Sequence, residues 1–302
     1  MRHETREEIP MKLRRCDSAT DFLEHARAPL EVKEAANNLI VGISARVAEH
    51  PEQVKFPAYF ATVDEGDRLV AAAVRTPPHR IIVHSELGAE PAPLRLILDD
   101  ILDYTASFDP ESPPGHVSGV VGHSTAAFAF AQLWRDRTGK PFKAGKSLRI
   151  YELRQVTPSV GVPGHLRHAH DNEVDLLADW ILNFNIDAGL PASTAEAREL
   201  AERRIDSGDL FIWEIEGQPV SMATKSRPSS HGITITLVYT PRELRNRGYA
   251  SACVAALSQQ MLDAGWEFCT LYTDLANPVS NSIYQRIGYR PVCDSNEYDF
   301  ER

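Results

Sequence analysis

The sequence predicts an α+β protein built from two copies of one unit, each a mixed central sheet flanked by helices. Residues 166–302 alternate strand-like and helical segments in a fixed order, and residues 1–155 repeat that order in a weaker form. A segment rich in proline and glycine, QVTPSVGVPG, lies between them. We therefore expect one domain at 1–155, a linker at 156–165 and a second domain at 166–302.

Hydrophobic spacing sets the order of elements in the second half. Helical spacing predicts helices over 172–187 and 195–205, and alternating or β-branched residues then predict the strands LFIWEI, VSMATKS and ITITLVY. A helix from near Gly248 to Gly265 and the strand FCTLYTD follow. The last helix runs from Asn277, its expected N-cap, to Gly288.

The first half repeats this order. YFATV, VAAAVRT and RIIVHS are its consecutive strands, and helical spacing covers 94–104 and 126–138 on either side of the strand VSGVVG. LRIYEL closes the half as a last strand. Both halves therefore follow the order strand, helices, three-strand meander, helix, strand, helix, strand.

Composition limits the class of protein. Of 302 residues, 43% are hydrophobic and 25% are charged, so the chain can form folded cores. The net charge of −10 argues against general nucleic-acid binding, which needs a basic surface. The N-terminal MRHETREEIP lacks the apolar segment of a signal peptide, and no apolar run is long enough for a membrane span. We expect a cytoplasmic protein without membrane partners.

The cysteines and histidines do not predict a metal site. The cysteines Cys16, Cys253, Cys269 and Cys293 form no CxxC pair, and the apolar patterns around Cys253 and Cys269 predict buried free thiols. The histidines of HLRHAH, at 165–170, have no carboxylate at helical spacing. We interpret them as structural or surface residues.

The strongest chemical signal is a cluster of positive charge where a helix begins. RELRNRGYAS follows a strand and leads into the helix predicted from Gly248. The first turn of a helix has N–H groups without internal partners and a partial positive charge, so it attracts anions. Gly248 and Ala250 leave these amides accessible, and Arg245 and Arg247 add full charges. This combination suits a polyphosphate, although neither GxxxxGK[ST] nor GxGxxG is present.

The spacing Arg245-x-x-Gly248-x-Ala250 resembles the motif [QR]-x-x-G-x-[GA] of the GCN5-related N-acetyltransferase (GNAT) superfamily. The resemblance implies tandem acyl-CoA N-acyltransferase-like (GNAT) folds, with acetyl-CoA as co-substrate and no metal. The loop would hold the coenzyme pyrophosphate, and the preceding strand would splay from its neighbour and bond the pantetheine arm. These roles fall on Val238, Tyr239, Arg245, Asn246, Arg247, Gly248, Tyr249, Ala250 and Ser251. The equivalent segment of the first half, LGAEPAPLRLILDD, lacks the motif, so we expect a degenerate copy.

A second segment, TDLANPVSNSIYQRIGYRPV, places Asn277, Asn281 and Tyr284 on one helix face. It resembles the family segment N-x-x-[SA]-x-x-x-Y-x-x-x-G-[FY]. The resemblance implies coenzyme contacts for Asn277 and Asn281. It also implies that Tyr284 gives a proton to the departing thiolate, while a backbone N–H near Val238 or Tyr239 polarises the thioester carbonyl.

Together these features predict an N-acetyltransferase that moves an acetyl group to a primary amine of a small molecule or peptide by direct attack. Neither Glu214 nor Glu216 is assigned as the general base. The resemblance implies that the first two helices border the acceptor site, which would place Asn183 and Asn185 near the acceptor. A non-catalytic acyl-CoA-binding or regulatory protein, another acyl donor, and an adaptor of two inert copies stay open as alternatives. The N-terminal copy would wall the acceptor cleft or support a homodimer.

Overall fold

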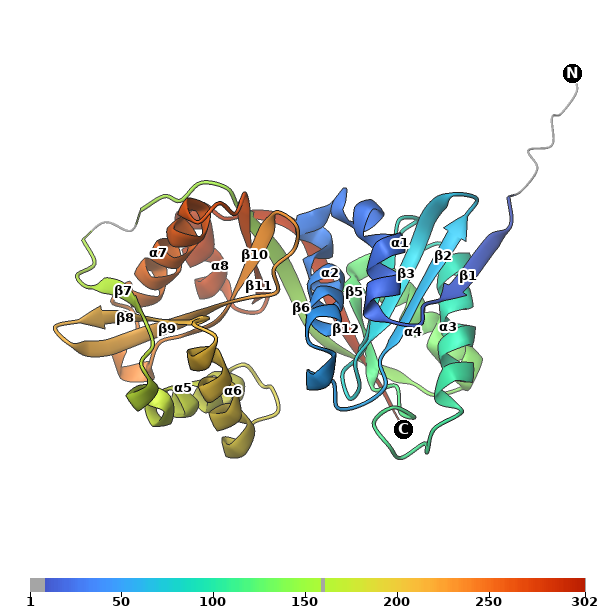
Figure 1. Ribbon diagram of the computed structural model, residues 1–302, viewed down its shortest axis with the longest axis horizontal. Coiled ribbons are helices and arrows are strands. Elements are labelled where there is room, and N and C mark those ends of the chain that lie inside the picture. Colours follow the sequence, from blue (N-terminus) through green and yellow to red (C-terminus); the bar gives the residue numbers. More distant parts are fainter. Residues whose placement is uncertain (1–8, 159–160, 302) are drawn as a thin grey trace, which may run out of the picture. The chain divides into compact units, whose positions relative to one another are not determined.

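The computed structural model describes residues 9–158 and 161–301, which form two compact units (Figure 1). The described residues up to Arg149 and from Cys293 onward make the N-terminal unit, and the C-terminal unit runs from Ile150 to Val292. These bounds differ from the predicted domains because the last strand of the chain packs in the N-terminal unit. Within the predicted linker, positions 159–160 lie outside the described residues.

The N-terminal unit follows the predicted order of elements. Its strands are β1 (Met11–Arg15), β2 (Tyr59–Glu65), β3 (Arg68–Arg75), β4 (Ile81–Ser85), β5 (Gly119–His123) and the first part of β6 (Phe142–Leu153). Its helices are α1 (Ala19–Glu31), α2 (Glu34–Glu49), α3 (Pro91–Thr105) and α4 (Ser124–Thr138). In Figure 1 the red strand β12 (Arg290–Phe300) lies beside β5, where Ser295 pairs with His123 and Asp299 with Gly119.

Helices cover both faces of the N-terminal sheet. Strands β1 to β4 are antiparallel, β4 and β5 are parallel, and β12 is antiparallel to β5. Since successive strand residues point to opposite faces, Phe60 and Val74 pack in the core with α1 and α2. Ala61 and Ala73 pack in the core with α3 and α4.

The C-terminal unit repeats the order, so the predicted α+β repeat is confirmed. Its strands are the end of β6, β7 (His165–His168), β8 (Leu210–Ile215), β9 (Gln218–Ser226), β10 (Gly232–Tyr239) and β11 (Phe268–Asp274). Its helices are α5 (Val174–Asp187), α6 (Thr194–Asp206), α7 (Tyr249–Asp263) and α8 (Pro278–Arg286).

The sheet of the C-terminal unit also lies between two layers of helices. Strands β7 to β10 are antiparallel, and β10 and β11 are parallel. Ile212 and Met222 pack in the core with α5 and α6, whereas Phe211 and Ala223 pack in the core with α7 and α8. The parallel pairing of β10 and β11 brings the loops before α7 and α8 to one end of the sheet.

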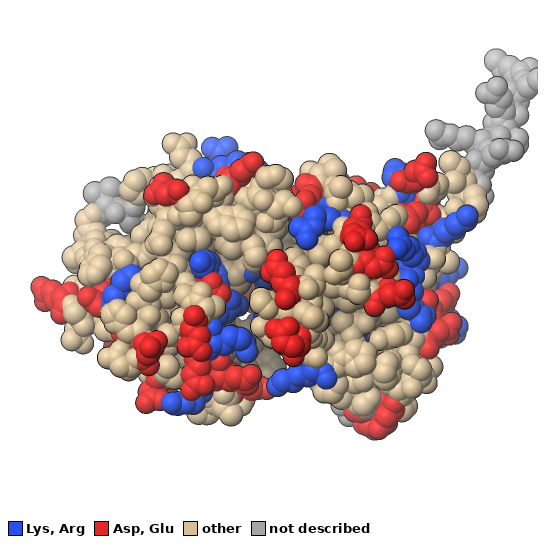
Figure 2. Space-filling model, viewed as in Figure 1, with Lys and Arg blue, Asp and Glu red and all other residues tan. Residues whose placement is uncertain are grey.

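Charges of both signs are interspersed over each unit on the face that Figure 2 shows. The acidic surplus of the chain therefore forms no extended acidic area on this face. Over residues 9–158 and 161–301, no helix combines the length and the apolar composition that a membrane crossing requires.

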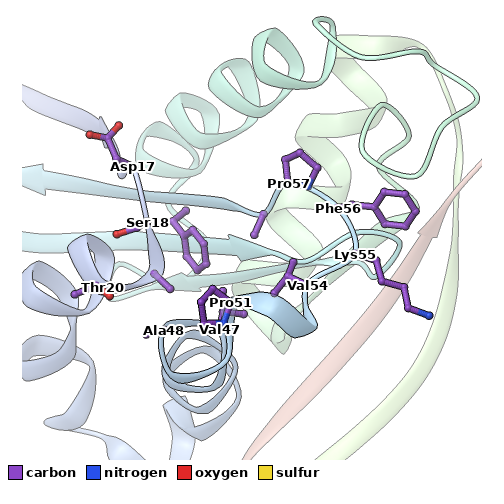
Figure 3. Close-up of a pocket in the computed structure, with 13 residues that line it drawn as sticks. Asp17, Ser18, Thr20, Val47, Ala48, Pro51, Val54, Lys55, Phe56 and Pro57 are labelled. Carbon is purple, nitrogen blue, oxygen red and sulfur yellow. The ribbon is translucent and has the colours of Figure 1, made fainter. Parts of the chain in front are cut away.

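A cavity of about 560 Å³ lies in the N-terminal unit, between the start of α1, the end of α2 and the loop before β2. Figure 3 shows Val47, Pro51, Val54 and Pro57 lining it, with Ser18 on the side of α1. Most of its lining is apolar. The residues predicted to bind the coenzyme or to act in catalysis all lie in the C-terminal unit instead.

His84, at the end of β4, is a buried titratable group of the N-terminal unit. Its Nε2 lies 3.1 Å from Glu86 Oε1, and its ring centre lies 5.8 Å from that of His123. Lys33 donates to the other oxygen of Glu86 at 3.0 Å. Burial, reinforced by the neighbouring His123, lowers the pKa of His84 to about 4, although the Glu86 carboxylate acts in the opposite direction.

We expect the N-terminal unit to lose stability as the pH falls from about 6.5 toward about 4. The folded state keeps His84 neutral in this range, whereas the unfolded chain binds a proton near the ordinary value of 6.5. The unfolded state therefore holds more protons and is favoured. Urea unfolding of a His84→Leu variant near neutral pH and near pH 5 (about the middle of this window) should show a smaller loss than the parent chain. His50→Gln changes an exposed histidine of the same unit and should keep the parent behaviour. An equal loss in His84→Leu and the parent would contradict the prediction.

Candidate active site

Strands β10 and β11 separate at their carboxyl ends. They pair in parallel from Gly232 with Phe268 to Thr234 with Thr270, although β10 continues to Tyr239 and β11 to Asp274. The burial of β10 also decreases over residues 236–238, just before its end. The edge of β10 that faces β11 is therefore not paired with it beyond Thr234. An extended ligand could form hydrogen bonds with the backbone of this edge in place of β11.

A β-bulge on the other edge of β10 accompanies this separation. The register with β9 shifts between Thr236 and Tyr239, and Leu237 has a left-handed φ of 49°. Ser221 of β9 is fully buried, and its hydroxyl donates to Tyr239 O at 3.0 Å and accepts from Thr240 Oγ1 at 2.9 Å. These bonds hold the bent end of β10 to β9, so that its end is directed away from β11.

An exposed loop with two left-handed residues leads from β10 to α7. Asn246 has a φ of 64°, and Gly248, at the N-cap position of α7, has a φ of 82°. The first helical hydrogen bond runs from Ala252 N to Gly248 O at 3.0 Å. The N–H groups of the three residues between them, Tyr249, Ala250 and Ser251, therefore have no acceptor within the helix. Such a helix start, with its dipole, attracts anions, and the binding of a pyrophosphate here stays a prediction.

Two arginines of this loop share one carboxylate. Arg242 Nη2 and Arg245 Nη2 each donate at 2.5 Å to a different oxygen of Asp187, the last residue of α5. Arg245 Nε also donates to Thr240 O at 3.0 Å, and its guanidinium carbon lies 5.6 Å from the centre of the Tyr239 ring. The Arg245 side chain is thus directed toward the ends of α5 and β10, and its contact with a pyrophosphate stays a prediction.

The other predicted residues of this region lie on both faces of the sheet. The Val238 side chain packs in the core with α7 and α8, whereas Tyr239 is buried in the core with α5 and α6. Arg247 is exposed, and its Nη2 donates to the carbonyl of Glu243 at 3.3 Å. The structure therefore places an exposed guanidinium within the loop that leads into the first turn of α7.

Asn277 and Asn281 are used in the turn that begins α8. Asn277 Oδ1 accepts from Ser280 N at 3.1 Å, which makes it the N-cap that the sequence predicted. Asn281 Nδ2 donates to Asp274 O at 2.9 Å and to Asn277 O at 2.7 Å, and its Oδ1 accepts from Tyr151 Oη at 2.9 Å. The Asn277 side chain thus caps α8, and that of Asn281 attaches α8 to the end of β11. A coenzyme contact by either stays a prediction.

Tyr284 lies on α8 and is partly buried. It packs against the core that also contains Cys253 of α7 and Val238 of β10, and its ring centre lies 6.0 Å from that of Tyr289. Burial raises the pKa of Tyr284 to about 12. The phenol therefore keeps its proton at neutral pH, as a proton donor must.

The cysteines are not activated as nucleophiles. Cys16, Cys253 and Cys269 are buried free thiols, and Cys293 is partly exposed. Burial raises the pKa of Cys253 and of Cys269 to about 12, and that of Cys16 and of Cys293 to about 11. At neutral pH all four are thiols, whereas a nucleophilic cysteine reacts as the thiolate.

Several other polar residues considered in the sequence have structural partners. Glu214 Oε2 accepts from Arg167 Nε at 2.5 Å, and Glu216 forms the hairpin turn with a φ of 49°. Asn183 Nδ2 donates to Asp179 O within α5 at 2.9 Å. Among the residues that the structure describes, no group of three or more histidine, cysteine or carboxylate side chains could hold a metal ion.

The N-terminal copy differs at both features, since β4 and β5 end at Ser85 and His123, soon after their last pair, and a different loop leads into α3. β4 and β5 pair as far as Val83 with Gly122, and a Cβ at Gly122 would lie 2.3 Å from the Val83 carbonyl oxygen. Its helix α3 begins at Pro91, after Glu90 at the N-cap position, and Pro93 follows. Since proline has no N–H and glutamate repels anions, the first turn of α3 is a poor phosphate site.

Comparison with known proteins gives a family match for part of the C-terminal unit. Residues 175–289 match the model of a family described as "Acetyltransferase (GNAT) family". No curated protein matches the sequence.

Solved structures resemble the whole chain. A Drosophila protein has a TM-score of 0.67 at 13% identity, and the match covers 96% of this chain and 98% of that one. A GCN5-related N-acetyltransferase from Sphaerobacter thermophilus has a TM-score of 0.60 at 11% identity, covering 96% and 95%. A tandem GNAT protein from the clavulanic acid biosynthesis pathway has a TM-score of 0.55 at 12% identity, covering 96% and 98%. At these identities the matches show a shared tandem fold.

Replacing Gly248 by alanine should weaken coenzyme binding as well as folding. Its φ of 82° costs a residue with a Cβ about 1–2 kcal/mol, and the new Cβ would lie 2.9 Å from Val162 Cγ2. A shift of the loop that broke one hydrogen bond to a phosphate would weaken CoA binding about tenfold. Calorimetry with CoA and thermal unfolding measure the two effects.

Gly265→Ala provides the matched control for this substitution. Gly265 follows the other end of α7 and has a φ of 100° with open space around it. It should lose comparable stability and keep CoA affinity. Equal CoA affinity in the two variants would argue against the loop as the anion site.

Proposed function

We propose that residues 175–289, which belong to the acetyltransferase (GNAT) family, transfer an acetyl group from acetyl-CoA to a primary amine. The observation that carries this proposal is the separation of β10 from β11 next to the anion loop at 245–251. A polyphosphate site and an unpaired strand edge, joined by a few residues, suit a ligand that combines a diphosphate with an amide-containing arm.

We propose that acetyl-CoA, the acetyl donor, binds along the anion loop and the adjoining edge of β10. The first-turn amides of α7, with the exposed Arg247, would hold the pyrophosphate, and the edge of β10 near Val238 and Tyr239 would bond the amides of the pantetheine arm. The thioester would then lie between the diverging strands. Tyr284 packs against the same core as Val238, which supports a place for its hydroxyl near the sulfur.

The chemistry needs no enzyme nucleophile. The amine nitrogen attacks the thioester carbonyl carbon, a C–N bond forms and the C–S bond breaks. A backbone N–H near Val238 or Tyr239 would stabilise the developing oxyanion, and the bulge at Leu237 would direct it. Tyr284 would give its proton to the departing thiolate and recover one from water. The amine loses its proton to a base that we do not assign.

An alternative keeps the loop but not the reaction. A non-catalytic acyl-CoA-binding protein would share the amides, the arginines and the strand edge. It is favoured by the hydrogen bond from Arg167 to Glu214, which engages one of the two carboxylates considered as the base. A measurement of turnover distinguishes the enzyme from the non-catalytic protein.

We expect the cytoplasm as the compartment, since the free thiols of the chain suit a reducing environment.

Two measurements test the proposal. Calorimetry should detect CoA binding by the intact chain, and acetyl-CoA with a panel of primary amines should release free thiol together with the acetylated amine. The panel would include small amines, amino acids and peptides with free N-termini. CoA binding without turnover across the panel would favour the non-catalytic alternative, and the absence of CoA binding would refute both.

Replacing Tyr284 by phenylalanine should lower kcat by about a hundredfold or more, because a positioned general acid contributes a factor of that size. The CoA dissociation constant should stay close to that of the parent chain, since the ring and its packing remain. Tyr289→Phe is the control. It removes a buried hydroxyl 2.9 Å from Ser258 Oγ, so we expect lower stability with kcat retained. A Tyr284→Phe variant with the parent kcat would remove Tyr284 from the mechanism.

A further inference from the structure

We propose that Asp187 is a positioning residue for the coenzyme loop, which it holds to the end of α5 through Arg242 and Arg245. This inference rests on the proposed function, because it assigns a role in donor binding. One carboxylate bonds two arginines that are three positions apart, each at 2.5 Å and each through its own oxygen. The arginines belong to the segment between β10 and Gly248, so the bonds act on the residues that lead into the anion site.

Arg245 connects the carboxylate to the end of β10. Its Nε donates to Thr240 O, and its guanidinium lies against the Tyr239 ring, which in turn lies 6.2 Å from the Trp180 ring of α5. Thr240 Oγ1 also bonds to the buried Ser221 of β9. The loop is therefore attached to α5, to β9 and to the end of β10 through connected side chains.

The carboxylate completes this network rather than blocking the anion site. Hydrogen bonds from Arg242 and Arg245 hold the pKa of the Asp187 carboxyl below its ordinary value, so it stays ionised at neutral pH. The amides that would bind phosphate belong to residues 249–251, further along the chain. Since Asp187 is 24% exposed and Arg242 is 73% exposed, water screens part of the attraction, and we expect a moderate effect on affinity.

The test compares Asp187→Asn with Asp175→Asn in the intact chain. Asp175 is also on α5 and also pairs with an arginine, Arg198, but it is 84% exposed and belongs to the α5–α6 contact. Hydrogen exchange without coenzyme reports the loop directly, because Leu244 N donates to Pro241 O at 2.9 Å and Arg245 N to Arg242 O at 3.4 Å. Calorimetry with CoA and the KM for acetyl-CoA report the donor site.

We expect Asp187→Asn to speed exchange at these two amides and to raise the CoA dissociation constant and the KM for acetyl-CoA about fivefold. At saturating acetyl-CoA, kcat should change by less than about twofold, because the residue does not touch the reacting atoms. Asp175→Asn should match the parent chain in all four measurements. Arg242→Gln should produce part of the loss, and the double variant should lose less than the sum, since the two residues share one contact.

Two results would overturn the inference. Unchanged loop exchange in Asp187→Asn would mean that the carboxylate does not hold the loop. Tighter CoA binding in that variant would mean that Asp187 competes with phosphate for the arginines. If the parent chain bound no CoA, the proposed function would fail while the exchange measurement still decided whether Asp187 holds the loop.

Discussion

The proposed site depends on where β10 parts from its two neighbours. Its pairing with β11 ends at Thr234, and its register with β9 shifts after Thr236. The bulge at Leu237 and the bonds of Ser221 keep the end of β10 with β9, and the pairing with β11 stops at Thr234. The proposed donor path depends on this geometry. The same bend carries the chain into the loop before α7, so the strand edge and the helix start come from one continuous segment.

The two units show how one fold keeps or loses a site. Both have a parallel strand pair followed by helices at the equivalent place. In the N-terminal copy β4 ends at Ser85, soon after its last pair at Val83, whereas β10 continues to Tyr239 after its last pair at Thr234. The N-terminal copy also begins α3 with prolines where the C-terminal copy presents amides. Neither change disturbs the layers of the unit, because packing depends on the apolar faces of the helices and strands. Similarity of fold therefore shows the architecture, and the local backbone determines the chemistry.

The positive charge of the loop between β10 and α7 is partly offset by a nearby carboxylate. The single carboxylate of Asp187 bonds both Arg242 and Arg245 and offsets one of their two positive charges, and in our proposal this contact shapes the loop. The attraction for phosphate would then come mainly from backbone amides and the helix dipole, with Arg247 beside them. Backbone amides are already held in place by the fold, whereas an arginine side chain loses conformational freedom when it binds a ligand. Binding phosphate mainly through amides therefore lowers the entropy cost of binding.

The sequence alone determined the features that depend on neighbours along the chain. The repeat of elements, the helix that starts at Gly248, the N-cap at Asn277 and the buried thiols of Cys253 and Cys269 all follow from local spacing. Only the tertiary structure showed that Asp187 bonds Arg245, because the two residues are 58 positions apart. It also showed that β12, at the end of the chain, pairs with β5 within the N-terminal unit, and that Asn281 is engaged by Tyr151 and Asp274. These contacts depend on how strands and helices pack against one another in space. The spacing of residues along the chain predicts the elements themselves but not which distant residues come into contact.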